Sequence, residues 1–161
     1  MNRETFIACV EREQEALRGF LLALCCGNRD EADDLAQDAL VKAYLACSGF
    51  RDGGKFRSWL FKIAHNTFLS YKRSPQTPTI SIDAVPIEAL PQRGSGEGAS
   101  SDLYLALATL PPKERSAITL FYLNGYSIKE IAAITEVSQD AVKQQLSRGR
   151  EKLREKLKID H

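Results

Sequence analysis

Hydrophobic residues recur at steps of three and four along most of the chain, and this spacing places them on one face of a helix. Between residues 56 and 73 the apolar stripe comprises Phe56, Trp59, Leu60, Ile63, Ala64, Thr67, Phe68 and Tyr71. Between residues 139 and 158 it comprises Val142, Leu146, Gly149, Leu153 and Leu157. No alternating pattern of a β-strand competes over a comparable length. The sequence therefore predicts an all-α protein.

Capping residues predict where several helices begin. Residues 2–26 form a helical stretch that Gly19 could interrupt, and Asn28 can cap the next helix, which runs to about Cys47. Further along, Ser127 and Glu130 stand three residues apart, as in a capping box. Ser138 can cap another helix after a short turn. The last two helices would then form a helix-turn-helix.

Composition divides the helical regions into two domains. Residues 74–101 contain four prolines, followed by the run Gly-Ser-Gly-Glu-Gly. Such a segment buries little apolar surface and is typical of a flexible linker. We expect two small helical domains, residues 1–73 and residues 102–161, joined by this linker.

Composition also excludes several classes of protein. The 161 residues are 43% hydrophobic, which is enough for packed cores. No run of about 18 apolar residues predicts a membrane span, and the N-terminus lacks the pattern of a signal peptide, so we expect a cytoplasmic protein. The sequence shows no P-loop glycines, no nucleophile–base arrangement and no set of metal ligands, so we expect no catalysis, no metal and no cofactor.

The four cysteines lie in the first third of the chain, at positions 9, 25, 26 and 47. None forms a CxxC pair, and two adjacent cysteines make a poor frame for a metal or a disulfide. We expect small buried thiols. A redox or metal-sensing role is the alternative, and the zinc content of the purified protein would distinguish the two.

The net charge is only +1, but the charges are unevenly distributed. Residues 1–50 carry nine acidic and five basic side chains, residues 51–73 carry six basic and one acidic, and residues 143–158 carry seven basic and two acidic. The two basic segments favour a nucleic acid as partner, and the acidic segment favours a protein.

Each charged segment groups its polar residues on one helix face. In the last helix, the face beside the apolar stripe carries amide and cationic groups that can contact base edges and phosphates: Lys143, Gln144, Ser147 and Arg148. In helix 56–73, cations, an amide and the ring of Phe61 share one face, a combination that suits single-stranded nucleic acid. For helix 56–73 the alternative is an ordinary solvated face. We expect His65 to lie at the surface or to face DNA.

An acidic stripe runs along the second predicted helix, through Asp30, Asp34, Gln37 and Asp38. Acidic residues near a helix N-terminus complement the helix dipole. That explanation covers Asp30, but it does not cover Asp38, which lies two turns into the helix. A protein-binding surface explains both.

The order of these segments resembles the bacterial sigma factors of RNA polymerase. Residues 30–44 resemble the polymerase-docking helix of sigma region 2, and residues 56–66 resemble the promoter-melting helix that follows it. Residues 110–118, 126–132 and 142–150 resemble region 4. No segment corresponds to region 1.1 or region 3, which is typical of the extracytoplasmic-function (ECF) subgroup.

The resemblance implies a protein that binds core RNA polymerase and directs initiation at promoter DNA of a stress or envelope regulon, without being an enzyme. The polymerase would be contacted by Asp34, Gln37 and Asp38. The −10 strand would be held by Lys62, His65, Asn66 and Ser70, to which the residue pattern adds Phe61. The −35 element would be contacted in the major groove by Lys143, Gln144, Ser147 and Arg148, and at a phosphate by Arg115. The resemblance also implies an anti-sigma factor, often membrane-anchored, as a regulatory partner.

Some positions depart from the family pattern. Asp140, Ala141 and Gln145 replace the glycine, threonine and arginine that many relatives carry, so the resemblance implies no particular −35 sequence. Ser70 stands where a longer polar residue is frequent. Two other classes remain open: a stand-alone helix-turn-helix repressor, which would bind DNA tightly without polymerase, and a protein-interaction adaptor, which would not bind DNA.

Overall fold

A computed structural model describes residues 1–50, 55–73 and 98–160. The elements are α1 (Arg3–Leu24), α2 (Arg29–Ala46), η1 (Cys47–Gly49), α3 (Phe56–Arg73), α5 (Gly98–Ala108), α6 (Pro112–Ile118), the π-helical turn η3 (Thr119–Leu123), α7 (Ile128–Thr135) and α8 (Gln139–Asp160). Within these ranges there is no β-strand, and the predicted all-α class is confirmed. The predicted linker falls on residues 74–97, outside the described residues, and on residues 98–101, which begin α5.

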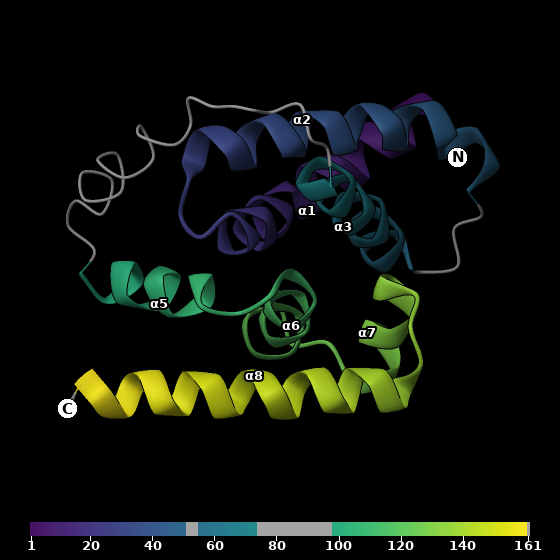
Figure 1. The fold of residues 1–161 in the computed structure, drawn as a ribbon. Coiled ribbons are helices and arrows are strands. Elements are labelled where there is room, and N and C mark those ends of the chain that lie inside the picture. The colour runs from purple at the N-terminus through teal and green to yellow at the C-terminus, as the bar shows by residue number, and fades with distance from the viewer. Residues whose placement is uncertain (51–54, 74–97, 161) are drawn as a thin grey trace.

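Helices α1, α2 and α3 pack on one another and form the first helical unit (Figure 1). The side chain of Asn28 caps α2 by accepting the backbone N–H of Glu31 at 3.1 Å, as predicted. Helix α1 continues through Gly19 without the break that the sequence allowed. A glycine inside a helix costs only about 1 kcal/mol relative to alanine, and the packing of α1 outweighs this cost. None of the described helices is long and apolar enough to cross a bilayer.

Helices α5 to α8 form the second unit, in which α8 lies along the edge of the molecule opposite α1–α3 (Figure 1). The predicted capping box is present: Ser127 Oγ accepts the N–H of Glu130 at 3.1 Å, and the Glu130 carboxylate accepts the N–H of Ser127 at 2.8 Å. Ser138 Oγ accepts the N–H of Ala141 at 3.0 Å. These local hydrogen bonds set the starts of α7 and α8, and the helix-turn-helix is where the sequence predicts it.

The two units pack directly against each other. Helix α3 lies against α7, and α1 contacts α5, α6 and η3. Buried apolar residues from both units belong to one continuous cluster, which includes Phe61 of α3 and Tyr126 before α7. The sequence predicts two tethered domains and does not predict this contact, which decides where several of the candidate residues lie.

Candidate nucleic-acid interface

The outer face of α8 carries the four residues predicted to enter the major groove. Lys143, Gln144, Ser147 and Arg148 are all exposed. The opposite face buries Val142 and Leu146, and both α6 and α7 pack on α8. The helix is therefore supported from behind and presents amide and cationic groups to solvent. This is the arrangement of a recognition helix in a helix-turn-helix.

Gly149 allows α8 to approach α6 closely. A Cβ atom at this position would lie 2.7 Å from Cγ1 and 3.0 Å from Cδ1 of Ile118. Carbon atoms do not pack at such distances, so a larger residue would force the Ile118 side chain or one of the two helices to shift. The sequence places Gly149 on the apolar face of α8, and the contact with Ile118 explains why a glycine occupies the position.

Helix α2 carries an exposed stripe that is acidic at one end and apolar at the other. Asp34, Gln37 and Asp38 are exposed, as predicted. The same face continues to Val41, which is 58% exposed, and Leu45, which is 74% exposed. Large apolar side chains that remain exposed beside charged groups mark interaction sites. We call this stripe the docking surface of α2; it comprises Asp34, Gln37, Asp38, Val41, Tyr44 and Leu45.

The apolar end of the docking surface was missed by sequence reasoning. Tyr44 is 45% exposed and does not belong to the buried side of α2. Helix α2 buries Leu35, Ala39 and Ala43. Val41 and Leu45 continue the three- and four-residue spacing of Asp34 and Asp38, on a different face from the buried stripe. This spacing was the signal that could have identified them.

The five α3 residues predicted to hold the −10 strand fall into two groups. Asn66 and Ser70 are exposed, and 42% of the Lys62 side chain is accessible. Phe61 and His65 are buried, with 0% and 2% of their surfaces exposed. The prediction that these two residues face outward is wrong for this arrangement, because the second unit covers their side of α3.

Phe61 lies between aromatic rings from both units. Its ring stacks on Phe20 of α1 with the centroids 4.9 Å apart, and Tyr126 of the second unit approaches it at 68° with the centroids 5.8 Å apart. Aromatic pairs of this kind contribute about 0.5–1.5 kcal/mol each beyond the burial of their surface. Phe20 and Tyr126 therefore occupy the contacts that a stacked base would need.

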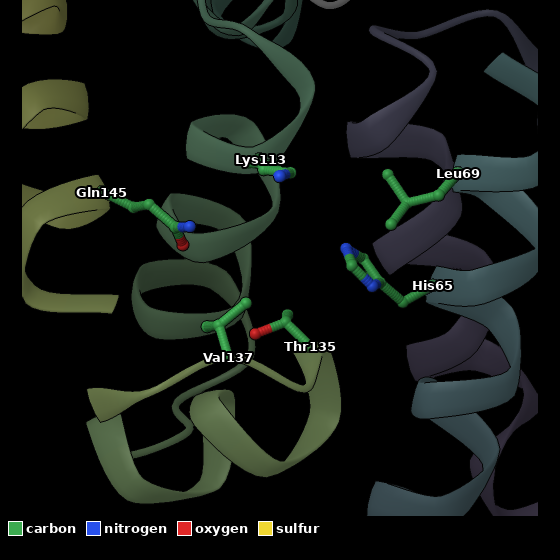
Figure 2. Close-up of a pocket in the computed structure, with 6 residues that line it drawn as sticks. All are labelled: His65, Leu69, Lys113, Thr135, Val137 and Gln145. Carbon is green, nitrogen blue, oxygen red and sulfur yellow. The ribbon is translucent and has the colours of Figure 1, made fainter. Parts of the chain in front are cut away.

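His65 lines a small pocket between α3 and the second unit (Figure 2). The pocket has a volume of about 30 Å³, room for a water molecule but not for a cofactor. The lining residues are His65, Leu69, Lys113, Thr135, Val137 and Gln145. His65 Nε2 lies 3.0 Å from Ser116 Oγ across the junction. Burial lowers the pKa of His65 from 6.5 to about 4, against a smaller opposing effect of the Glu136 carboxylate, so the ring is neutral at pH 7.

The contact between the units should weaken as the pH falls below 6.5. The pKa of His65 is about 4 in the buried site and returns toward 6.5 when the units separate, so within this window protons favour the separated form. The stabilisation of the closed form by neutral His65 is complete above pH 6.5 and is lost as the pH falls toward about 4. Between about pH 7.5 and about pH 5.5 the ratio of closed to open chain should fall about tenfold. Energy transfer between dyes on α2 and α8 measures this ratio.

The control for this pH dependence is His65→Gln. The charged groups near the ring are Lys62 on α3, Lys113 on α6 and Glu136 at the end of α7. A glutamine keeps a polar group beside Ser116 but has no proton to gain in this range. The variant should open to the same extent at both pH values; a pH response equal to that of the unmodified chain would assign the effect to other groups.

Arg115, predicted to contact a DNA phosphate, is instead buried between the two units. Its guanidinium donates hydrogen bonds to the carbonyl oxygens of Leu24 at 2.8 Å, Leu107 at 3.0 Å and Leu110 at 2.9 Å. Leu24 is the last residue of α1, where carbonyl groups lack helical partners. Leu107 lies in the last turn of α5, and its oxygen also accepts the N–H of Leu110 at 3.0 Å. Only 8% of Arg115 is exposed, so its guanidinium is not available to a DNA phosphate in this arrangement, and the phosphate contact stays a prediction. The residue joins one unit to the other.

The cysteines are mostly core residues, as predicted. Cys9, Cys25 and Cys47 are buried and Cys26 is partly buried. Desolvation by burial raises the pKa of the Cys25 thiol, and a thiol that stays protonated is a weak nucleophile and a poor metal ligand. Over the ranges that the structure covers, no group of three or more His, Cys, Asp or Glu side chains is placed to hold a metal ion.

Family models and relatives identify the chain. Residues 9–77 match Sigma-70 region 2, and residues 100–153 match Sigma-70, region 4. The ECF RNA polymerase sigma factor EcfG of Rhodopseudomonas palustris is 32% identical over 148 residues, which are 90% of this chain and 81% of that protein. The chain belongs to the ECF RNA polymerase sigma factors. The ECF sigma-E factor of Escherichia coli K12 is also 32% identical to this sigma factor, over 79% of the chain and 74% of that protein.

Solved structures share the fold of this sigma factor over nearly its whole length. The sigma factor RpoE of Bartonella quintana, in complex with the anti-sigma factor NepR, superposes with a TM-score of 0.75 at 27% identity and covers 99% of this chain and 100% of its own. CnrH, in complex with the cytosolic domain of CnrY, superposes with a TM-score of 0.74 at 27% identity and covers 99% of this chain and 92% of its own. Sigma factors are transcription initiation factors, and the predicted partners, core RNA polymerase and promoter DNA, follow from the family.

Proposed function

We propose that this ECF sigma factor reads the −35 element with the exposed face of α8. The proposal rests on how α8 is packed. One face contacts α6 and α7, and the other exposes Lys143, Gln144, Ser147 and Arg148. Gln144 can pair with an adenine and Arg148 with a guanine or a phosphate, since both side chains can form two parallel hydrogen bonds. In this assignment residues 102–161 form the region 4 domain.

Residues 1–73 form the region 2 domain in this proposal, with two separate tasks. The docking surface of α2 binds core polymerase, where its acidic end would meet basic groups and its apolar end would be buried. Helix α3 holds the non-template strand of the −10 element through Lys62, Asn66 and Ser70, which are accessible. Phe61 and His65 join them when the second unit moves away, and Asn66 is the residue expected beside a flipped base.

An anti-sigma factor is the regulatory partner in this proposal. Two relatives with the same fold were solved in complexes, RpoE with the anti-sigma factor NepR and CnrH with the cytosolic domain of CnrY. A partner of that kind would compete with polymerase for the docking surface of α2, which combines exposed apolar and acidic groups. These tasks place the protein in the cytoplasm.

The test of the −35 assignment is Arg148→Ala. A single arginine contact to a base or phosphate is worth about 1–3 kcal/mol, so transcription by the reconstituted holoenzyme from a promoter with its native −35 element should fall about tenfold. Binding to core polymerase should not change. The measurement is run-off transcription together with a polymerase pull-down.

The matched control is Arg154→Ala, an exposed arginine on another face of the same helix. It removes the same charge but should reduce transcription by less than about twofold, because phosphates outside the groove contribute little at this distance. Equal losses in the two variants, or a loss of polymerase binding with Arg148→Ala, would contradict the assignment.

A further inference from the structure

We infer that the second helical unit acts as a lid on the α3 face that would hold the −10 strand, while the closed chain keeps its −35 face open. The inference rests on the proposed function, since it uses the roles given to α3 and α8. Its consequence is an order of events: the free chain can contact duplex DNA through α8, but a single strand can engage the whole candidate −10 set of α3, including the buried Phe61 and His65, only after the lid has opened.

Four contacts of different chemistry hold the lid. The ring of Tyr126 packs on Phe61, and Ser116 Oγ lies 3.0 Å from His65 Nε2. Glu136 forms an ion pair with Lys62 at 3.1 Å. The fourth contact is the hydrogen bond from the Arg115 guanidinium to the last carbonyl of α1. We call Ser116, Tyr126 and Glu136 the lid residues, because each of them covers an α3 residue of the candidate −10 set.

The lid blocks α3 sterically as well as electrostatically. Phe61 and His65 have 0% and 2% of their surfaces exposed, so no base can touch them until Tyr126 and Ser116 have moved. The Lys62 ammonium that would neutralise a phosphate is already paired with Glu136. A carboxylate at that point also repels an approaching strand.

The lid does not cover the candidate −35 surface on α8. Helix α8 lies on the far side of the second unit from α3 (Figure 1), and Lys143, Gln144, Ser147 and Arg148 are exposed in the same closed arrangement. Closure therefore acts on one of the two DNA contacts and leaves the other free. The apparent affinity for a single strand is reduced by the fraction of molecules that are open, whereas duplex affinity is not.

Two lid variants open the chain without touching either predicted DNA-binding set. Ser116→Arg places a long cation in a site where only 1% of the serine is exposed, directly against His65. Glu136→Lys sets two ammonium groups opposite each other, and it replaces an exposed residue, so the fold of the unit is retained. Glu155→Lys is the control; it reverses an exposed charge on α8 and adds the same charge to the second unit.

The experiment measures shape and binding on the full chain. Small-angle scattering should give the unmodified protein a radius of gyration of about 15 Å, the value for a compact chain of this length. The radius of gyration should be larger for the lid variants. Fluorescence anisotropy with an A/T-rich single-stranded oligonucleotide should show a gain of about tenfold for Ser116→Arg and of about two- to fivefold for Glu136→Lys, since an exposed ion pair is weak. Affinity for a mixed-sequence duplex should change no more than it does in Glu155→Lys.

The outcomes separate the lid from the proposed function. If the unmodified chain binds the single strand as tightly as the lid variants do, or if the variants stay as compact as the unmodified chain, the lid is overturned and the promoter-reading role stands. Equal gains for single strand and duplex would also overturn it, because added charge alone would explain them. If the opened variants bind neither DNA, the roles given to α3 and α8 fail, and the inference fails with them.

Discussion

Replacing Arg115 with methionine should lower the free energy of unfolding by about 3 kcal/mol. The guanidinium satisfies three carbonyl oxygens, of Leu24, Leu107 and Leu110, at 2.8–3.0 Å in a site where the residue is only 8% exposed. Without Arg115 the Leu107 oxygen still accepts the N–H of Leu110, whereas the oxygens of Leu24 and Leu110 lose this donor. A buried acceptor left without a donor costs about 1–3 kcal/mol, and relief of the buried charge offsets part of the sum. Urea denaturation followed by circular dichroism measures the change.

Two further variants make the Arg115 result specific. Arg115→Lys keeps the charge but cannot reach three carbonyls at once, so it should recover only part of the stability. Arg154→Met removes an exposed arginine and should change the free energy of unfolding by less than about 0.5 kcal/mol. If Arg115→Met is as stable as Arg154→Met, Arg115 does not join the two units in solution.

Reversing the charge at Asp34 should abolish co-purification with core RNA polymerase. Asp34 is exposed at the acidic end of the docking surface of α2, and its side chain forms no hydrogen bond or ion pair with another of the described residues. A like charge placed against a basic partner surface costs several kcal/mol, which is a loss of at least about a hundredfold in affinity. A pull-down of polymerase with tagged Asp34→Arg protein measures it.

The control for Asp34→Arg is Glu11→Arg, which reverses another exposed charge in the same unit, on α1. This variant should retain polymerase, and both proteins should unfold at the same temperature as the unmodified chain. Undiminished polymerase binding by Asp34→Arg would remove Asp34 from the interface. Leu45→Ser then tests the apolar end of the same surface, where 74% of the leucine is exposed.

The parts of the fold that depend on local interactions could be predicted from the sequence. Ser127 and Glu130 form the capping box that their spacing indicates, and Asn28 caps α2. The buried side of α8 begins with Val142 and Leu146, as the period of the apolar residues predicts. Each of these features involves residues within one or two helical turns, so one segment of sequence contains all the information that it needs.

The parts that depend on the contact between units could not be predicted. A polar helix face that packs on a second unit has the same periodicity as one that faces water. Phe61 and His65 were therefore predicted to be accessible, although both are buried. The clearest signs were Phe61 and Leu69, two large apolar residues that share a face of α3 with His65. Arg115 reaches Leu24 across 91 positions of sequence, and no local pattern reports a partner that distant.

The most direct test of the sigma-factor role is run-off transcription with purified core RNA polymerase and the unmodified chain, on DNA upstream of genes that its overexpression induces. The role predicts one discrete transcript that requires both polymerase and the chain, starting downstream of a −35 and a −10 element. A chain that binds the same DNA tightly without polymerase and yields no transcript would be a helix-turn-helix repressor, and that result would contradict the role.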